Sequence, residues 1–177
     1  MNPEPDVSRG FSFPAVGGAV LLSADASRAG FTAFKFATFP EFAELFQSKV
    51  DWQDDARLGL AGHGGNILTV EIAESYAARA LECAESTARE LAAAQALDLG
   101  EVDLLVATAS VPGFADALAM RLGVSAERVA SLPDDLAHAH TAAPAIALES
   151  VQLAAASTTL FVSVGAGMTT AAALYRA

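Results

Sequence analysis

The stretch that most constrains the fold is residues 158–175, which contains no charged side chain. It is long enough to be considered as a membrane helix, yet it holds four Thr, one Ser and, in its middle, Gly165 and Gly167. Glycines at this spacing are typical of a tight turn, and threonine is common in strands. The stretch therefore predicts two strands joined by a turn rather than a membrane span.

The rest of the chain alternates between strand-like and helix-like segments. Apolar runs predict strands, and apolar residues spaced three and four apart predict helices, the longest over 68–97. A short helix and a loop are expected over 40–55. This alternation predicts an α/β fold with a helix-covered, mixed five-stranded sheet. The strands expected are 15–24, 31–39, 102–108, 128–132, 159–164 and 169–175, and the other helices are 112–122 and 142–156. The sheet is expected to contain 102–108, 159–164 and 169–175, with helices 68–97 and 142–156 packed on it.

Composition limits the kinds of partner. Hydrophobic residues make up 53% of the chain before its 13 glycines are counted, above the roughly 45–50% typical of a soluble domain with glycine included. This excess favours a partner that covers apolar surface. The net charge of −11 argues against nucleic acid and against an anionic membrane, because both attract cationic groups. Residues 1–6 lack the features of a secretion signal, which predicts a cytoplasmic protein, and a single Cys excludes an intrachain disulfide or a Cys-rich metal site.

The end of the chain carries a family resemblance. Residues 160–169 read Leu-Phe-Val-Ser-Val-Gly-Ala-Gly-Met-Thr, and residues 171–176 read Ala-Ala-Ala-Leu-Tyr-Arg. They resemble the end of a thiolase-fold ketosynthase of the β-ketoacyl-ACP synthase III group, which has an apolar strand, a Gly-Gly-Gly-Phe-Thr turn and a closing strand with an Arg. Residues 102–106 and 117–123 resemble the strand and helix that bracket the family's His-Gln-Ala-Asn motif, and residues 17–22 resemble its Gly-Asp-Gly-Ala strand.

This resemblance implies a domain organisation and a chemistry. It implies a loose tail over 1–12 and a thiolase-like C-terminal half domain over 13–177. The family transfers an acyl group to a cysteine and then forms a carbon–carbon bond; a His and an Asn hydrogen-bond the enolate oxygen, and an amide of the glycine turn holds the other oxyanion. The His position falls on Thr108 and the Asn position near His138 or His140. The residues implied to bind substrate are Thr108, Gly165, Ala166 and Gly167.

The candidate side chains also have ordinary structural interpretations. Cys83 lies mid-helix on an apolar face, so we interpret it as a small buried side chain rather than a nucleophile. His138 and His140 are the candidate catalytic residues, and a structural role for both stays open. Two His one residue apart suit a metal only with a third ligand, so no metal is expected, and the resemblance implies no cofactor. His63 is interpreted as a turn residue in a Gly-rich loop.

Three functions remain open. The first is the small subunit of a heteromeric synthase III-like acyltransferase of fatty acid or polyketide biosynthesis. The family's nucleophilic Cys belongs to the first half of the fold, before the point where this chain begins, so a Cys-bearing partner would supply it. The second is a split enzyme that shares its active site through His138 or His140. The third is a self-associating scaffold or thioester-binding module without chemistry.

The partners expected follow from these functions. A Cys-bearing ketosynthase-like chain is the first choice, and a homodimer is the second. An acyl carrier protein or a CoA thioester is a candidate further partner. The strand expected near residues 16–23 completes the first-half sheet in the family, so here it is expected to extend a partner's sheet.

Overall fold

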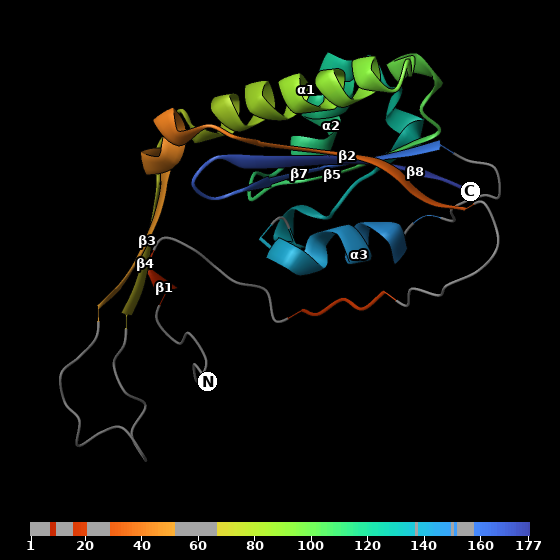
Figure 1. The fold of residues 1–177 in the computed structure, drawn as a ribbon. Coiled ribbons are helices and arrows are strands. Elements are labelled where there is room, and N and C mark those ends of the chain that lie inside the picture. The colour runs from red at the N-terminus through yellow and green to blue at the C-terminus, as the bar shows by residue number, and fades with distance from the viewer. Residues whose placement is uncertain are drawn as a thin grey trace.

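The centre of the computed structural model is a mixed five-stranded sheet with helices on both faces (Figure 1). The structure describes residues 8–9, 16–20, 29–51, 67–136, 138–149, 151 and 158–177. The strand order is β2-β8-β7-β5-β6; β5 runs parallel to β6 and β7, whereas β8 is antiparallel to both of its neighbours. The predicted fold class is therefore confirmed. The strands are β2 (Gly30–Thr38), β5 (Leu104–Thr108), β6 (Val129–Ala130), β7 (Thr158–Gly165) and β8 (Thr169–Arg176).

One face of the sheet is covered by α1 (Tyr76–Ala94) and α2 (Phe114–Leu122), and we call it the covered face (Figure 1). Strand side chains alternate, so every second residue of β7 and β8 points into this layer. Leu160, Val162 and Leu174 are all at most 1% exposed there. Helix α2 ends where Gly123 takes a φ of +77°, a left-handed conformation that favours glycine and stops the helix.

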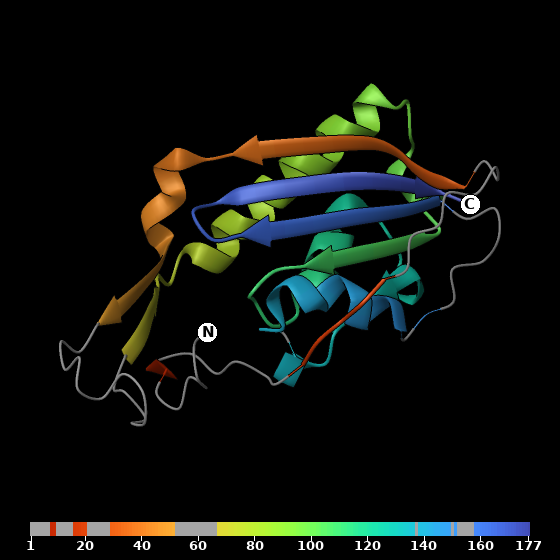
Figure 2. The same cartoon turned by 60° about the horizontal axis from the view of Figure 1, so that its bottom comes forward.

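The opposite face carries one helix, α3 (Ala143–Glu149), which lies over β5 and β6. Ala147 of α3 packs with Val106 and Ala130 in a small second core. The same side of β2, β8 and β7 has no helix over it among the described residues (Figure 2), and we call it the open face. Its side chains are mostly aromatic or small: Phe31, Phe34, Phe36, Phe161, Ala171, Ala173 and Tyr175.

Strand β2 is the edge strand that borders the open face. Its pairing with β8 shifts register between Phe31 and Ala33, so Thr32 is an extra residue in a bulge. The hydroxyl of Thr32 donates to the carbonyl of Leu174 over 3.3 Å. The bulge puts Phe31 on the same side as Phe34, and their rings lie 5.6 Å apart.

A small second sheet projects from the main sheet as an arm (Figures 1 and 2). Its strand order is β1-β4-β3, with β1 (Ser8–Arg9), β3 (Phe46–Asp51) and β4 (Ile67–Ile72), and a short 3-10 helix, Pro40–Leu45, leads into β3. Two sequence predictions were wrong here: β3 was expected as loop, and β4 as the first turns of the long helix. The β-branched residues of β4 pair with β3 instead, and the helix begins at Tyr76.

Residues 16–20 run beside α3, on the side away from the five-stranded sheet (Figures 1 and 2). They form no strand in either sheet, although a strand was expected there. A Cβ at Gly18 would come within 2.7 Å of the Cβ of Ala145, so only glycine allows this close approach to α3. The rest of that expected strand, most of the 1–12 tail, His63 and residues 152–156 of the expected helix lie outside the described residues.

None of the helices in the described ranges is both long and apolar enough to cross a membrane.

Candidate functional site

A cavity of about 350 Å³ lies at the carboxyl ends of the neighbouring parallel strands β5 and β7. The chain leaves β5 toward α2 on the covered face, while α3 lies on the other face, so a crevice forms between them. Such strand ends are the usual ligand position in open α/β sheets. We call this space the site cavity. It is lined by Phe46, Thr108, Ala109, Ser110, His140, Thr141, Ala143, Pro144, Ser163, Val164, Gly165 and Ala166.

Two hydroxyl groups from adjacent strands lie together in this cavity. Thr108 ends β5, and the β5–β7 register places it opposite Ser163. The Thr108 hydroxyl donates to the Ser163 hydroxyl over 3.2 Å. Thr108 is only 5% exposed, whereas Ser163 is exposed. The pair therefore presents a polar group at the cavity surface rather than a buried one.

The two candidate histidines occupy different positions. His140 lines the site cavity from the segment that leads into α3, and its φ of +49° is uncommon outside glycine. His138 is half-buried and does not line the cavity. Burial lowers the pKa of His138, and the nearby His140 lowers it further, so His138 resists protonation. Of the two, His140 is the one that a ligand in the cavity would meet.

The glycine turn closes the cavity on the β7 side. Gly165 and Ala166 line the cavity, whereas Gly167 does not. A Cβ at Gly165 would come within 3.0 Å of the Thr169 hydroxyl, and Gly167 has a φ of +75°, so glycine suits both positions. The carbonyl of Met168 accepts a hydrogen bond from the amide of Phe39 at 2.9 Å, which ties the turn to the end of β2.

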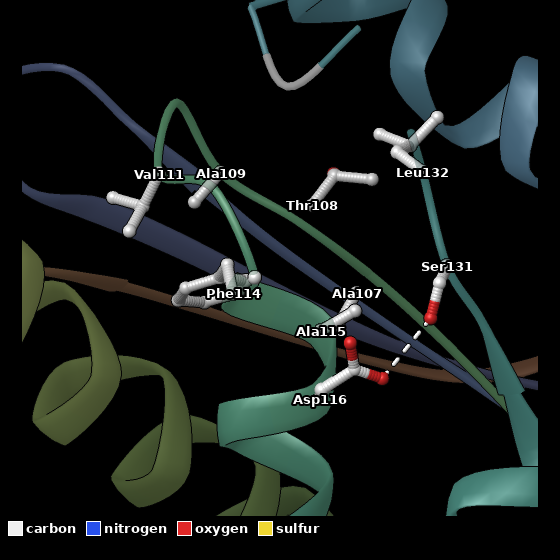
Figure 3. Close-up of a pocket in the computed structure, with 10 residues that line it drawn as sticks. Ala107, Thr108, Ala109, Val111, Phe114, Ala115, Asp116, Ser131 and Leu132 are labelled. Carbon is white, nitrogen blue, oxygen red and sulfur yellow. Dashed lines mark hydrogen bonds between the residues drawn. The ribbon is translucent and has the colours of Figure 1, made fainter. Parts of the chain in front are cut away.

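A second, much smaller cavity borders Thr108 from the direction of α2 (Figure 3). It holds about 20 Å³, which is room for about one water molecule. The Ser131 hydroxyl donates to a carboxylate oxygen of Asp116 over 3.1 Å across its edge (Figure 3). This space is too small for a substrate. We therefore interpret the hydrogen bond between Ser131 and Asp116 as structural, because it joins the start of α2 to the chain after β6.

Cys83, the single cysteine of the sequence, does not line the site cavity. It is 4% exposed within α1, over the covered face. Strand alternation places Thr108 on the same side as Val106, and Ser163 on the same side as Phe161, which is the opposite side of the sheet. Burial raises the pKa of its thiol, and the carboxylates of Glu41 and Glu82 raise it further. A buried thiol with a raised pKa is a poor nucleophile.

The chemistry of the site cavity is that of neutral hydrogen bonding. Apart from His140, its lining has no titratable side chain, and no group of three potential metal ligands occurs within the described ranges. The hydroxyls and the turn amides can bind a carbonyl oxygen. Sequence reasoning missed Ser110, Thr141 and Ser163, and the alternation along β7 is the signal that places Ser163 on the cavity side.

The fold matches known proteins. Residues 92–177 match the family model described as 3-oxoacyl-[acyl-carrier-protein (ACP)] synthase III C terminal. No curated protein sequence matches the chain. The resemblance of the sequence to the C-terminal half of a synthase III is thus confirmed.

Solved structures with the same fold include two of 3-oxoacyl-[acyl-carrier-protein] synthase III. The Aquifex aeolicus enzyme is 18% identical with a TM-score of 0.70, over 88% of this chain and 47% of the enzyme. The Pseudomonas aeruginosa enzyme is 18% identical with a TM-score of 0.64, over 87% and 46%. A variant of OleA from Xanthomonas campestris is 12% identical with a TM-score of 0.60, over 84% and 40%. The chain spans about half the length of these proteins.

Proposed function

We propose that the chain is the small subunit of a heteromeric synthase III-like acyltransferase. The match of residues 92–177 to the family model described as 3-oxoacyl-[acyl-carrier-protein (ACP)] synthase III C terminal supports this proposal. In this proposal the chain is non-catalytic by itself. It completes the fold and the acyl-thioester pocket of a cytoplasmic partner chain that bears the nucleophilic cysteine. The thioester would come from an acyl carrier protein or from coenzyme A.

The observation that carries this proposal is the open face. Phe34 and Phe36 are 57% and 74% exposed there, beside a hollow of about 90 Å³ whose walls are almost entirely apolar. A contiguous aromatic surface of this kind favours a protein partner. The hollow shares Thr108 and Ser163 with the site cavity, so a partner seated on the open face would also close the site.

Residues 16–20 supply a second supporting observation. They are exposed, and Val16 and Val20 are 41% and 63% exposed. They lie outside both sheets, so we propose that their main chain adds as a strand to the partner's sheet. Helix α3 would then lie between the two sheets of the complex, because Gly18 already packs against it.

The position of Cys83 supports a cysteine supplied in trans. Acyl transfer in this family needs a thiolate that can reach the thioester carbonyl. Cys83 is buried over the covered face with a raised thiol pKa, so it does not meet that need. The isolated chain should therefore show no acyl transfer or decarboxylation with acyl and malonyl thioesters, and Cys83→Ala should change nothing in that assay.

Co-expression with a Cys-bearing ketosynthase-like chain encoded beside this one tests the proposal. We expect a stable complex by size-exclusion chromatography with light scattering, which Phe36→Asp dissociates. Met120→Asp is the matched control, because Met120 is 83% exposed on α2, away from the open face. A monomer that ignores the Cys-bearing chain, or a homodimer that excludes it, would contradict the proposal.

A split enzyme is the second candidate, and the position of His140 in the site cavity favours it. In that case His140→Ala should lower the rate of the complex by about 10²-fold, the usual scale for a positioned proton donor, without dissociating it. His138→Ala should have a much smaller effect, because His138 does not line the cavity. Full activity in both variants would leave the chain with an architectural role.

A further inference from the structure

Two hollows meet on the α3 side of the sheet. The site cavity has several hydroxyls and His140 in its lining, whereas the 90 Å³ hollow over the open face has mostly aromatic and alanine side chains. Thr108, Pro144 and Ser163 border both spaces. The hydroxyl pair therefore lies where a cavity that holds several hydroxyls and His140 meets a hollow with almost entirely apolar walls.

The direction of the hydrogen bond distinguishes the two hydroxyls. The proton of Thr108 is used, because this hydroxyl donates to the oxygen of Ser163. The proton of Ser163 is not used in that bond, and within the described part of the chain its hydroxyl has no other hydrogen bond. A hydroxyl that accepts one hydrogen bond becomes a stronger donor of another. Ser163 is also the more exposed of the two.

We propose that Ser163 donates a hydrogen bond to the carbonyl oxygen of a bound acyl thioester and that Thr108 is a positioning residue that holds the Ser163 hydroxyl in place. The inference rests on the proposed function, which supplies the thioester as the class of ligand. The geometry suits such a ligand, because its acyl chain can lie along Phe34, Phe36 and Phe161 while its polar part occupies the site cavity. The carbonyl group then lies at the junction, beside Ser163.

Calorimetric titration of the full chain with two probes tests this role. Hexanoyl-CoA carries the carbonyl oxygen, and its thioether analogue hexyl-CoA lacks it. We expect Ser163→Ala to weaken binding of hexanoyl-CoA about fivefold to tenfold, the effect of one hydrogen bond, and to leave hexyl-CoA unchanged. Thr108→Val should give a smaller loss with hexanoyl-CoA alone, and Thr108→Ser should restore it. Ser86→Ala, an exposed serine on α1, is the matched control and should bind both probes as wild type does.

Three results would overturn the assignment. Equal weakening of both probes by Ser163→Ala would make Ser163 a general surface contact. Unchanged binding of both probes by Ser163→Ala would exclude a hydrogen bond to the carbonyl. Failure of the wild-type chain to bind hexanoyl-CoA would exclude the site altogether. None of these results bears on complex formation with the Cys-bearing chain, which is measured separately by light scattering, so the two proposals fail independently.

Discussion

The two faces of the five-stranded sheet are built from the same strands, yet they differ in what covers them. On the covered face, α1 and α2 bury Leu160 and Leu174 completely. On the open face, the neighbouring positions of β7 and β8 hold Phe161 and Ala173, and α3 lies over β5 and β6 instead. The first face holds the larger core of the domain, and the second leaves aromatic side chains exposed. The contrast teaches that exposure here follows from where the helices lie and not from the polarity of the strands.

The largest expected effect separates the two faces directly. Leu160→Ala should lower the free energy of unfolding by about 2–5 kcal/mol, because Leu160 is fully buried in the covered face and its loss leaves a cavity. Phe36→Ala should cost less than about 1 kcal/mol in the isolated chain, because Phe36 is 74% exposed. Urea unfolding measures both. Equal losses would mean that the open face is already packed in the chain alone.

A buried hydroxyl pair gives the next effect, within the covered face. The Thr87 hydroxyl on α1 donates to the carbonyl of Cys83, so the Thr170 hydroxyl on β8 donates to Thr87 over 2.6 Å. Thr87→Val should destabilise the chain by about 1–3 kcal/mol, because it leaves the Thr170 hydroxyl buried without its partner.

A double-mutant cycle checks this pair. The double variant with Thr87→Val and Thr170→Val should lose less free energy of unfolding than the two single variants lose in sum, because it leaves no buried hydroxyl without a partner. Additive losses in urea unfolding would show that the two hydroxyls do not interact.

The smallest effect concerns the outer surface of the covered side. Glu85 of α1 accepts hydrogen bonds from Arg89 at 3.0 Å and from Arg121 of α2 at 3.2 Å. The Arg89 hydrogen bond is the main cause that lowers the pKa of Glu85, with Arg121 adding to it. Glu85→Gln should cost a few tenths to about 1 kcal/mol at pH 7.

The sign of its pH dependence follows from linkage. A lowered pKa in the folded state means that Glu85 stabilises the fold above the ordinary glutamate pKa and loses this contribution as the pH falls through the lowered value. The difference in the free energy of unfolding between Glu85→Gln and wild type should therefore become smaller in urea unfolding at a pH well below the ordinary glutamate pKa. A difference that is equally large at that pH would exclude the ion pairs as its source.

The sequence predicted the fold where local signals agreed with one another. Strands β7 and β8 followed from an uncharged run around a glycine turn, and α2 followed from a glycine stop at Gly123. Strand β4 was missed because Ile72 continues the helical spacing of Tyr76 and Ala80 by coincidence. Only its pairing with β3, far away in sequence, makes β4 a strand.

The candidate site was predictable in part for a different reason. Thr108, His140, Gly165 and Ala166 were named from the order of motifs along the chain, and all four line one cavity. Ser163 was not named, because a serine within an apolar strand matches no motif. Its contact with Thr108 depends on the register between β5 and β7, which the local sequence does not specify.

The bulge at Thr32 has a consequence for how the edge of the sheet meets other copies of the chain. A long, regular edge strand with exposed phenylalanines is a template on which identical molecules stack into insoluble fibrils. The extra residue interrupts the even spacing of main-chain groups along β2 and increases its local twist, so a second copy cannot pair along its whole length. An irregularity of one residue thus makes the start of β2 a poorer template for another strand, while the aromatic side chains stay accessible.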